Sequence, residues 1–438
     1  MQQERLAEAE QIIRQNDRGT YTVPTKGLYP FQWNWDSCLT ALGIAHFDEA
    51  RAWTEIETLF AHQWPDGMVP HIVFHVPDDG YFPGPEVWDT GRPVPTSGIT
   101  QPPVAGFAVR RLFERAQDRG LAERQARALV PKIAAWHEWF YRCRDPEGSG
   151  LAAILHPWES GRDNAADWDG PLDQVPTDGA QPFQRRDTDH ADAAHRPTDA
   201  QYTRFIWLVQ HFRLLGWDSA RLHDRSPFCV VDPGLNAILV RSCADLAVLA
   251  EVLGLAEIAA RSRRLAERGA AALEALWNPS AGQYLCRDRR TGALIDSRSH
   301  GGLLPVFAPI AARRAAAIAE RVEAIAARAP FLVPSHDPAA PGFEPRRYWR
   351  GPTWLITNYL IADGLARAGH GALADRIVES SLRLIDQGAF AEYYDPLTGA
   401  PCGGSHFTWT AAMVIEFLAG WTTAGRTTDD GPAEQGTA

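Results

Sequence analysis

The 438-residue sequence is poor in sulfur-containing residues, with 6 cysteines and 3 methionines. No two cysteines form a Cys-x-x-Cys pair, so we expect free thiols rather than a disulfide framework or a zinc site. No apolar run approaches the length that crosses a membrane, and residues 1–5 are charged rather than signal-like. These absences predict a cytoplasmic protein.

The sequence also lacks an excess of positive charge, because its formal net charge is -11 at pH 7. This charge argues against nucleic acid and anionic membranes as partners. It leaves an anionic small molecule open, since a local pocket can oppose the global sign. The Gly-rich nucleotide loops, the nucleophile elbow and the His-Glu-x-x-His motif are missing as well. We therefore expect no metal and no nucleotide cofactor.

What the chain does contain is helical periodicity almost from end to end. Apolar residues recur with a 3.6-residue period at 3–15, 37–46, 49–64, 102–117, 122–143, 199–215, 235–254, 256–277, 308–328, 353–368, 371–386 and 408–421. About a dozen helices without a clear linker predict one all-α domain over residues 1–421, and two concentric rings of six helices, an (α/α)6 barrel, would use that number. We expect short β-hairpins in its loops, for example near 283–286, and a disordered tail at 422–438. The oligomeric state is open, and a homo-oligomer is permitted.

Three long connections rich in Pro, Gly and charge interrupt the helices at about 75–101, 164–198 and 331–347. Connections this long in a compact domain are often functional, so we interpret them as lids over a cleft. The middle one carries a cluster that resembles a set of metal ligands. Its polar surroundings favour a solvated charge run instead, formed by Asp187, Asp189, His190, Asp192 and His195.

Two carboxyl groups stand beside aromatic residues. Asp163 follows Trp158 in a short segment of small residues, and Glu392 precedes Tyr393 in an aromatic-rich stretch. Apolar surroundings keep a carboxyl group protonated to higher pH, which is what a general acid needs. Two such groups brought together by the fold are the outline of a glycoside hydrolase, and the 16 tryptophans offer flat faces for sugar rings.

Each of these residues also has a structural interpretation. Asp36 stands before a predicted helix and is either an N-cap residue or the neighbour of one, or a ligand of sugar hydroxyls, or both. Asp163 and Glu159 could instead be carboxylates of a structural loop that cap a helix or bind backbone N–H groups, an interpretation that has more weight for Glu159 than for Asp163. Glu392 and Arg196 could be ordinary surface residues, because both residue types are mostly exposed.

Four segments together resemble glycoside hydrolase family 63, and within it the compact bacterial members that hydrolyse glucosylglycerate and mannosylglycerate. They are the runs 29–37, 63–70, 159–164 and 348–354, which occur in the family's order. The resemblance covers residues 20 to 421. It implies an (α/α)6 barrel and an inverting mechanism, with Asp163 as general acid and Glu392 as general base.

The resemblance also implies a substrate pocket and no cofactor. Sugar-contacting positions would be Tyr29, Trp33, Asp36, Gln101, Trp158, Gly161, Tyr348, Trp349 and Trp354. A second group would hold the carboxylate of an anionic aglycone, because an Arg fork matches a carboxylate, and it comprises Tyr81, Arg196 and Tyr202.

Three other functions stay open. The first is the same hydrolysis of a neutral disaccharide or glycan end. The second is a sugar epimerase or isomerase, which the absence of a prominent His pair disfavours. The third is a catalytically silent carbohydrate-binding protein, which would need stacking and hydrogen bonds but no acid opposite a base.

Overall fold

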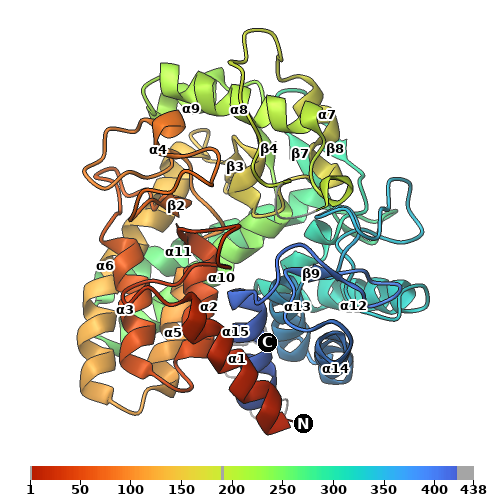
Figure 1. Cartoon of the computed structure of the whole chain (residues 1–438). Helices are drawn as coiled ribbons and strands as arrows, with labels where there is room; N and C mark the ends of the chain where they lie inside the picture. The colour runs from red at the N-terminus through yellow and green to blue at the C-terminus, as the bar shows by residue number, and fades with distance from the viewer. Residues whose placement is uncertain (1, 189–191, 422–438) are drawn as a thin grey trace, which may run out of the picture.

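A computed structural model describes residues 2–188 and 192–421, and the chain there is mostly helical, as predicted (Figure 1). The tail predicted at 422–438 lies outside the described residues. The α-helices are α1 (Gln2–Asn16), α2 (Asn34–Ile44), α3 (Glu49–Phe60), α4 (Pro85–Trp88), α5 (Ala105–Arg115), α6 (Arg119–Cys143), α7 (Asp169–Asp173), α8 (Asp199–Leu214), α9 (Ser219–Arg225), α10 (Pro233–Val252), α11 (Ala256–Leu273), α12 (Ala312–Ala326), α13 (Leu355–Arg367), α14 (Gly371–Gly388) and α15 (Thr408–Ile415).

Each of the predicted helices is present, with its ends shifted by a few residues. Helix α2 begins at Asn34, three residues before the predicted start, and α12 begins at Ala312 rather than 308. The last helix leaves the α pattern at Glu416, where a π turn continues to Gly420. Helix ends are set by caps and packing as well as by period, so such shifts are expected.

The helices pack in a closed order. Helix α2 contacts α5, α5 contacts α10, and α10 contacts a short 3-10 turn at Leu304–Phe307. That turn contacts α13, α13 contacts α15, and α15 returns to α2. A second set lies against the first, since α1 packs on α15, α3 on α2, α6 on α5, α11 on α10, α12 on the 3-10 turn and α14 on α13.

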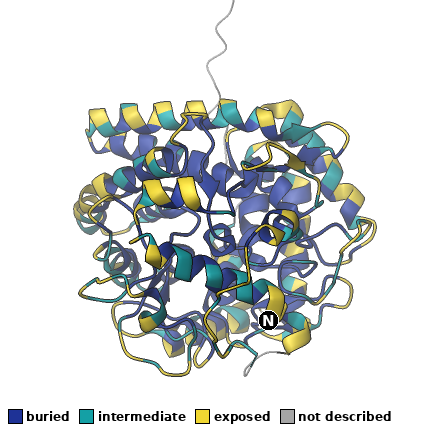
Figure 2. Cartoon of the chain, turned by 90° about the horizontal axis from the view of Figure 1, so that it is seen from above, coloured by how far each residue is buried: buried dark blue, intermediate teal, exposed yellow. Residues whose placement is uncertain are grey.

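Composition explains which helices lie inside. All residues of α2 and α15 are buried, as is α13 from Leu355 to Leu365, and helices that are buried on every side belong in a core. Helices α3, α6, α11, α12 and α14 bury one face and expose the other. Figure 2 shows the same division, with buried segments in the middle and exposed faces along the periphery.

Short strands join the loops at one end of the helices. They are β1 (Gln32–Trp33), β2 (Ile72–Val73), β3 (Ala153–Ile154), β4 (Val230–Val231), β5 (Trp277–Asn278), β6 (Gln283–Tyr284), β7 (Cys286–Asp288), β8 (Leu294–Ile295), β9 (Tyr393–Tyr394) and β10 (Pro401–Cys402). The hairpin expected near 283–286 is present as β5–β6, which pairs Trp277 with Tyr284. The antiparallel sheet β3–β4–β7–β8 was not predicted, because strands of two or three residues carry no measurable period.

Candidate active site

One cavity collects residues from six or more distant segments at the loop end of the helices. Its lining includes two catalytic candidates and ten predicted binding residues. The lining comprises Pro24, Tyr29, Trp33, Trp35, Asp36, His71, Tyr81, Phe82, Gln101, Trp158, Gly161, Asp163, Asp187, Arg196, Pro197, Tyr202, Tyr348, Glu392, Phe407 and Trp409.

Asp163 reaches this cavity because a tight turn at Gly161 precedes it. A 3-10 helix at Pro157–Ser160 ends on Gly161, whose φ of 68° lies in the left-handed region. A Cβ on Gly161 would stand 2.6 Å from an atom of the Trp35 ring, so both the backbone and the space require glycine. The turn thus leads the chain from the 3-10 helix to Asp163, which lines the cavity together with Trp35.

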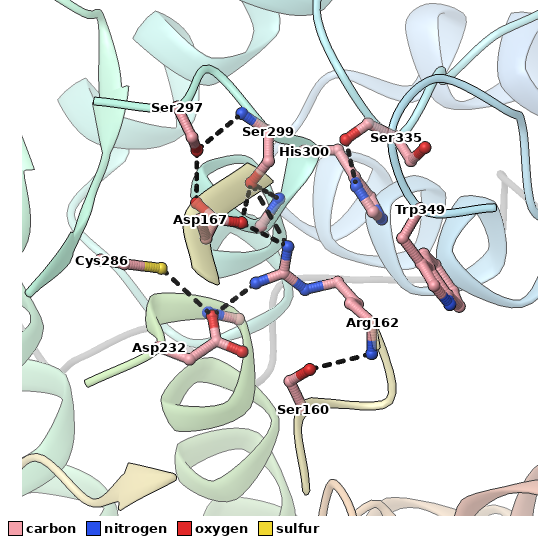
Figure 3. Close-up of polar contacts among 12 residues, drawn as sticks. Ser160, Arg162, Asp167, Asp232, Cys286, Ser297, Ser299, His300, Ser335 and Trp349 are labelled. Carbon is pink, nitrogen blue, oxygen red and sulfur yellow. Dashed lines mark hydrogen bonds and ion pairs between the residues drawn. The ribbon is translucent and has the colours of Figure 1, made fainter. Parts of the chain in front are cut away.

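A buried ion cluster fixes the residue before Asp163 (Figure 3). Arg162 lies between two carboxylates, with Nη1 2.9 Å from Asp167 Oδ2 and Nη2 2.9 Å from Asp232 Oδ1. Asp232 also caps α10 by accepting a hydrogen bond from the backbone N–H of Gly234. All three charged side chains are buried. The segment that carries Asp163 is therefore tied to the start of a core helix.

The residue after Asp163 is held equally firmly. The Asn164 side-chain oxygen accepts a hydrogen bond from the backbone N–H of Trp349 at 2.9 Å. Trp349 stacks on Trp354 with ring centroids 3.8 Å apart, and on His300 in nearly parallel planes. Asp163 thus stands between two anchored neighbours, which fix the position of its backbone.

The environment of Asp163 favours its protonated form. Burial, which disfavours the anion, raises its pKa to about 7, and the charges of Glu392 and Asp187 act in the same direction. Arg196 opposes them by favouring the carboxylate. A carboxyl group with this pKa can donate a proton near neutral pH.

Glu392 is buried directly before strand β9, and both of its oxygens have partners. Oε2 accepts a hydrogen bond from the backbone N–H of Gly404 at 3.0 Å. Oε1 accepts one from the Tyr29 hydroxyl at 3.1 Å and lies 3.8 Å from Arg196 Nη1. Burial raises the pKa of Glu392 above its usual range, while Arg196 and these hydrogen bonds oppose the rise. Donors on both oxygens favour the ionised form that a general base requires.

Asp36 faces the same cavity from the first turn of α2. Its backbone lies inside the helix, and the N-cap position belongs to Trp33, so the predicted N-cap role is wrong. Burial raises the pKa of Asp36 well above its usual range, and the nearby carboxylates of Glu392 and Asp163 add to the rise. Tyr29 packs edge-on against Trp33, which completes an aromatic wall beside this carboxyl group.

Arg196 enters the cavity from the end of the middle connection and is 5% exposed, so it is no ordinary surface residue. Its Nη2 donates to the Tyr29 hydroxyl at 2.9 Å. The guanidinium lies over the Tyr348 ring, 4.2 Å from the centroid. The Tyr348 backbone has a φ of 38°, an uncommon conformation for a side chain of this size. Such outliers gather at functional sites, because the surrounding structure must hold them.

The other predicted binding residues surround these groups. Tyr81 packs edge-on against Trp33, and the Tyr202 hydroxyl donates to the backbone oxygen of Phe82 at 3.1 Å. The Gln101 side-chain oxygen accepts a hydrogen bond from the backbone N–H of Trp35, and Trp158 closes the cavity on another side.

Two predicted sugar contacts do not line the cavity. Trp349 and Trp354 are 1% and 0% exposed and stack on each other behind residues that do line it. Trp349 approaches Trp35, and Trp354 packs against Tyr348. Their positions support the aromatic wall rather than forming its surface.

The neighbouring Glu159 has the structural role that its sequence context favours. Oε1 pairs with Arg144 Nη2 at 2.7 Å, and Oε2 accepts a hydrogen bond from the backbone N–H of Leu155 at 2.7 Å. Both charged side chains are 1% exposed.

The predicted solvated charge run is wrong for Asp187, which lines the cavity with its side chain 11% exposed. The side chain of His195 is also largely covered, at 15% exposed, whereas that of Asp192 is 62% exposed and in water. Asp189 and His190 lie outside the described residues. Within residues 2–188 and 192–421, no group of three or more His, Cys, Asp or Glu side chains is arranged to hold a metal ion.

The sequence also left other lining residues unassigned, among them Trp35, His71, Phe82 and Phe407. Trp35 stands inside the run 29–37 that the sequence already marks, so its proximity to Asp36 was the available signal. In the part of the chain that the structure describes, no helix is both long and apolar enough to span a membrane.

Comparisons with known proteins agree with this geometry. Residues 29–410 match the mannosylglycerate hydrolase MGH1-like glycoside hydrolase domain. The chain is 47% identical over 420 residues to mannosylglycerate hydrolase MGH1 of Selaginella moellendorffii, covering 95% of this chain and 86% of that protein. It is 35% identical over 442 residues to the glucosylglycerate hydrolase of Mycolicibacterium hassiacum, covering 94% and 97%.

A crystal structure of the family 63 mannosylglycerate hydrolase of Thermus thermophilus, in complex with Tris and D-glycerate, superposes with a TM-score of 0.91 at 46% identity. The match covers 94% of this chain and 99% of that one. The chain is therefore a glycoside hydrolase and belongs to the MGH1-like group of glycoside hydrolase family 63.

Proposed function

We propose that the protein hydrolyses the α-glycosidic bond of mannosylglycerate or glucosylglycerate, releasing the hexose and glycerate with inversion at the anomeric carbon. The observation that carries this proposal is one cavity that holds Asp163, the buried carboxyl groups of Asp36 and Glu392, and a buried arginine among aromatic walls. The similarity to mannosylglycerate and glucosylglycerate hydrolases, one of which binds D-glycerate in its crystal structure, supports the choice of substrate.

The helices are proposed to form an (α/α)6 barrel within a single catalytic domain over residues 1–421. The closed order of contacts through α2, α5, α10, α13 and α15 supports an inner ring, with the 3-10 turn at 304–307 in the sixth place. The helices packed on these elements then form the outer ring. Such a barrel brings the early and late segments of the chain to one cavity.

Asp163 is proposed as the general acid and Glu392 as the general base. Asp163 protonates the glycosidic oxygen, while Glu392 takes a proton from a water that attacks the anomeric carbon from the opposite face. An inverting site keeps its two carboxyl groups about 6.5–9.5 Å apart to leave room for that water. The hydrogen bonds from Tyr29 and Gly404 keep the Glu392 carboxylate oriented for this step.

The remaining predicted residues are proposed to bind the substrate. Asp36 and Gln101 would accept or donate hydrogen bonds to sugar hydroxyls, and Trp33 and Trp158 would contact the ring. Arg196 would hold the glycerate carboxylate, with Tyr81 and Tyr202 beside it on the cavity wall. Arg suits this role because its charged fork is matched to a carboxylate.

The test is hydrolysis of a panel by the purified protein, namely mannosylglycerate, glucosylglycerate, trehalose and kojibiose. Proton NMR follows the anomer that appears first. Cleavage of the glycerate compounds with initial release of the β-anomer supports the proposal. Cleavage confined to the neutral disaccharides contradicts the assigned aglycone, and initial release of the α-anomer contradicts inversion.

Variants Asp163→Asn and Glu392→Gln test the assigned roles in the same assay. We expect each to fold and to lose at least about 100-fold in kcat, which is the lower range for a positioned acid or base. The matched control is Asp192→Asn, an exposed carboxylate. Near-normal activity in either active-site variant contradicts its assignment.

A further inference from the structure

The middle connection reaches into the cavity through Asp187, a residue for which the proposed reaction has no use. Asp187 Oδ2 accepts a hydrogen bond from Arg196 Nε at 3.2 Å. Arg185 holds the same carboxylate from the other side, with Nε 3.0 Å from Oδ1 and Nη2 2.7 Å from Oδ2. Asp187 therefore links a guanidinium at the rim to the guanidinium inside the cavity.

Arg185 is itself anchored, so the position of Asp187 is not left to a free loop. Arg185 Nη1 donates to the backbone oxygen of Pro197 and to Asp199 Oδ1, both at 2.8 Å. Its guanidinium lies 4.5 Å from the ring centroid of Tyr202. The nearby ring of Phe183 stacks on Phe82 with centroids 5.5 Å apart. Charge and packing together fix this part of the connection over the cavity.

The Arg196 guanidinium already lies close to two carboxylates without any ligand bound. Its Nε is bound to Asp187, and its Nη1 faces Glu392 Oε1 at 3.8 Å. Nη1 is buried without a hydrogen-bond partner among the described residues. A carboxylate that reaches this guanidinium becomes the third anion around it. Like charges a few ångströms apart in a partly dry site repel strongly, and Arg185 offsets only part of that repulsion.

We propose that Asp187 is a specificity-determining residue: its carboxylate competes with the aglycone carboxylate for Arg196 and so weakens the hold on glycerate. The inference rests on the proposed function, because it takes the partner of Arg196 to be the glycerate carboxylate. A site without this competitor would bind an anionic product tightly and release it slowly. Asp187 thus sets how strongly the cavity prefers an anionic ligand over a neutral one.

The test compares the affinities of D-glycerate and glucose by calorimetry in the full-length protein and in Asp187→Asn. Asparagine keeps an oxygen that accepts from Arg196 but removes the charge. We expect D-glycerate to bind roughly tenfold more tightly to the variant, since one repulsive charge a few ångströms away is removed. Glucose is neutral, so its affinity stays unchanged. Hydrolysis should show a lower KM for the glycerate glycosides and stronger inhibition by D-glycerate.

The control is Asp192→Asn, which makes the same charge change in the same connection. Asp192 accepts a hydrogen bond from the backbone N–H of Ala194, and asparagine can also accept it. We expect this variant to bind both ligands as the unaltered protein does. Equal tightening of D-glycerate in both variants would indicate a general charge effect and would overturn the assignment to Asp187.

A purely structural role for Asp187 predicts the opposite result, because loosening Arg196 would weaken glycerate binding. Unchanged or weaker D-glycerate affinity in Asp187→Asn, with glucose binding retained, overturns the proposal. Asp187→Ser removes the same charge with a smaller side chain and decides the question if the asparagine variant does not fold. Failure of the proposed function looks different, since the unaltered protein would then neither bind D-glycerate nor cleave its glycosides.

Discussion

Replacing Asp163 with asparagine should stabilise the folded protein at alkaline pH while it removes activity. The pKa of Asp163 rises from an ordinary 3.8 to about 7, mainly because the side chain is desolvated. The folded state therefore binds this proton more tightly than the unfolded state does. The resulting stability is complete below the unfolded pKa and is lost as pH rises through about 7.

The magnitude follows from the difference between the two pKa values. Each tenfold change in the proton equilibrium is worth about 1.4 kcal/mol, so the ionised Asp163 costs the fold roughly 4 kcal/mol at pH 8. At pH 5 the cost is about 2 kcal/mol, since the unfolded state alone has ionised there. Asparagine has no charge at either pH. Its stability relative to aspartate should therefore grow by roughly 2–3 kcal/mol between pH 5 and pH 8.

The assay is urea unfolding followed by the fluorescence of the 16 tryptophans at several pH values. Asp178→Asn is the control, because it removes one exposed carboxylate from the surface. A stability difference between Asp163→Asn and the unaltered protein that stays constant from pH 5 to pH 8 refutes the reasoning. It would mean that the fold does not hold Asp163 in its protonated form.

Three further outcomes are expected. The value of kcat/KM should fall above about pH 7, because Asp163 loses its proton there. On the acidic side, kcat/KM should fall at a pH above the usual range of a glutamate, because the pKa of Glu392 is raised. A kcat/KM that stays constant from pH 6 to pH 9 contradicts this. Arg162→Met should reduce the free energy of unfolding by about 3–5 kcal/mol, because it leaves Asp167 and Asp232 buried without their cation. The control Arg127→Gln removes an exposed ion pair and should reduce it by less than about 1 kcal/mol in the same denaturation assay. Gly403→Ala should reduce kcat more than it raises KM, because the added Cβ would stand 2.3 Å from Glu392 Oε2. Gly399→Ala is the kinetic control: its φ of 77° is close to the 72° of Gly403, but it lies away from Glu392.

The helical part of the fold was predictable because its signal is local. Long helices such as α6 and α10 repeat the same apolar spacing over many turns, and chance rarely imitates that. Helices α4, α7 and α9 were missed because four, five and seven residues hold too few repeats. The strands of two or three residues carry even less local information, and they form only because distant segments meet.

The lining of the cavity was predictable where several of its residues stand in one motif. Trp33 and Asp36 stand within one short run, as do Trp158 and Asp163, so each pair can be recognised together. Trp349 and Trp354 belong to an equally clear motif, yet they stack behind the lining. The sequence shows that these tryptophans belong to a motif, but tertiary packing decides whether each ring faces the cavity or lies behind its wall.

Asp187 shows what a sequence pattern cannot carry. It stands among Asp, Arg and His residues in a connection without period, and that composition is typical of a surface exposed to water. The same composition supplies the alternating charges of Arg185, Asp187 and Arg196, which neutralise one another once the segment lies over the cavity. Whether such a charged segment is solvated or buried depends on the part of the fold that it packs against. Here it meets the aromatic rings of Phe82 and Tyr202, which remove water from one side and leave the guanidinium groups to balance the carboxylate.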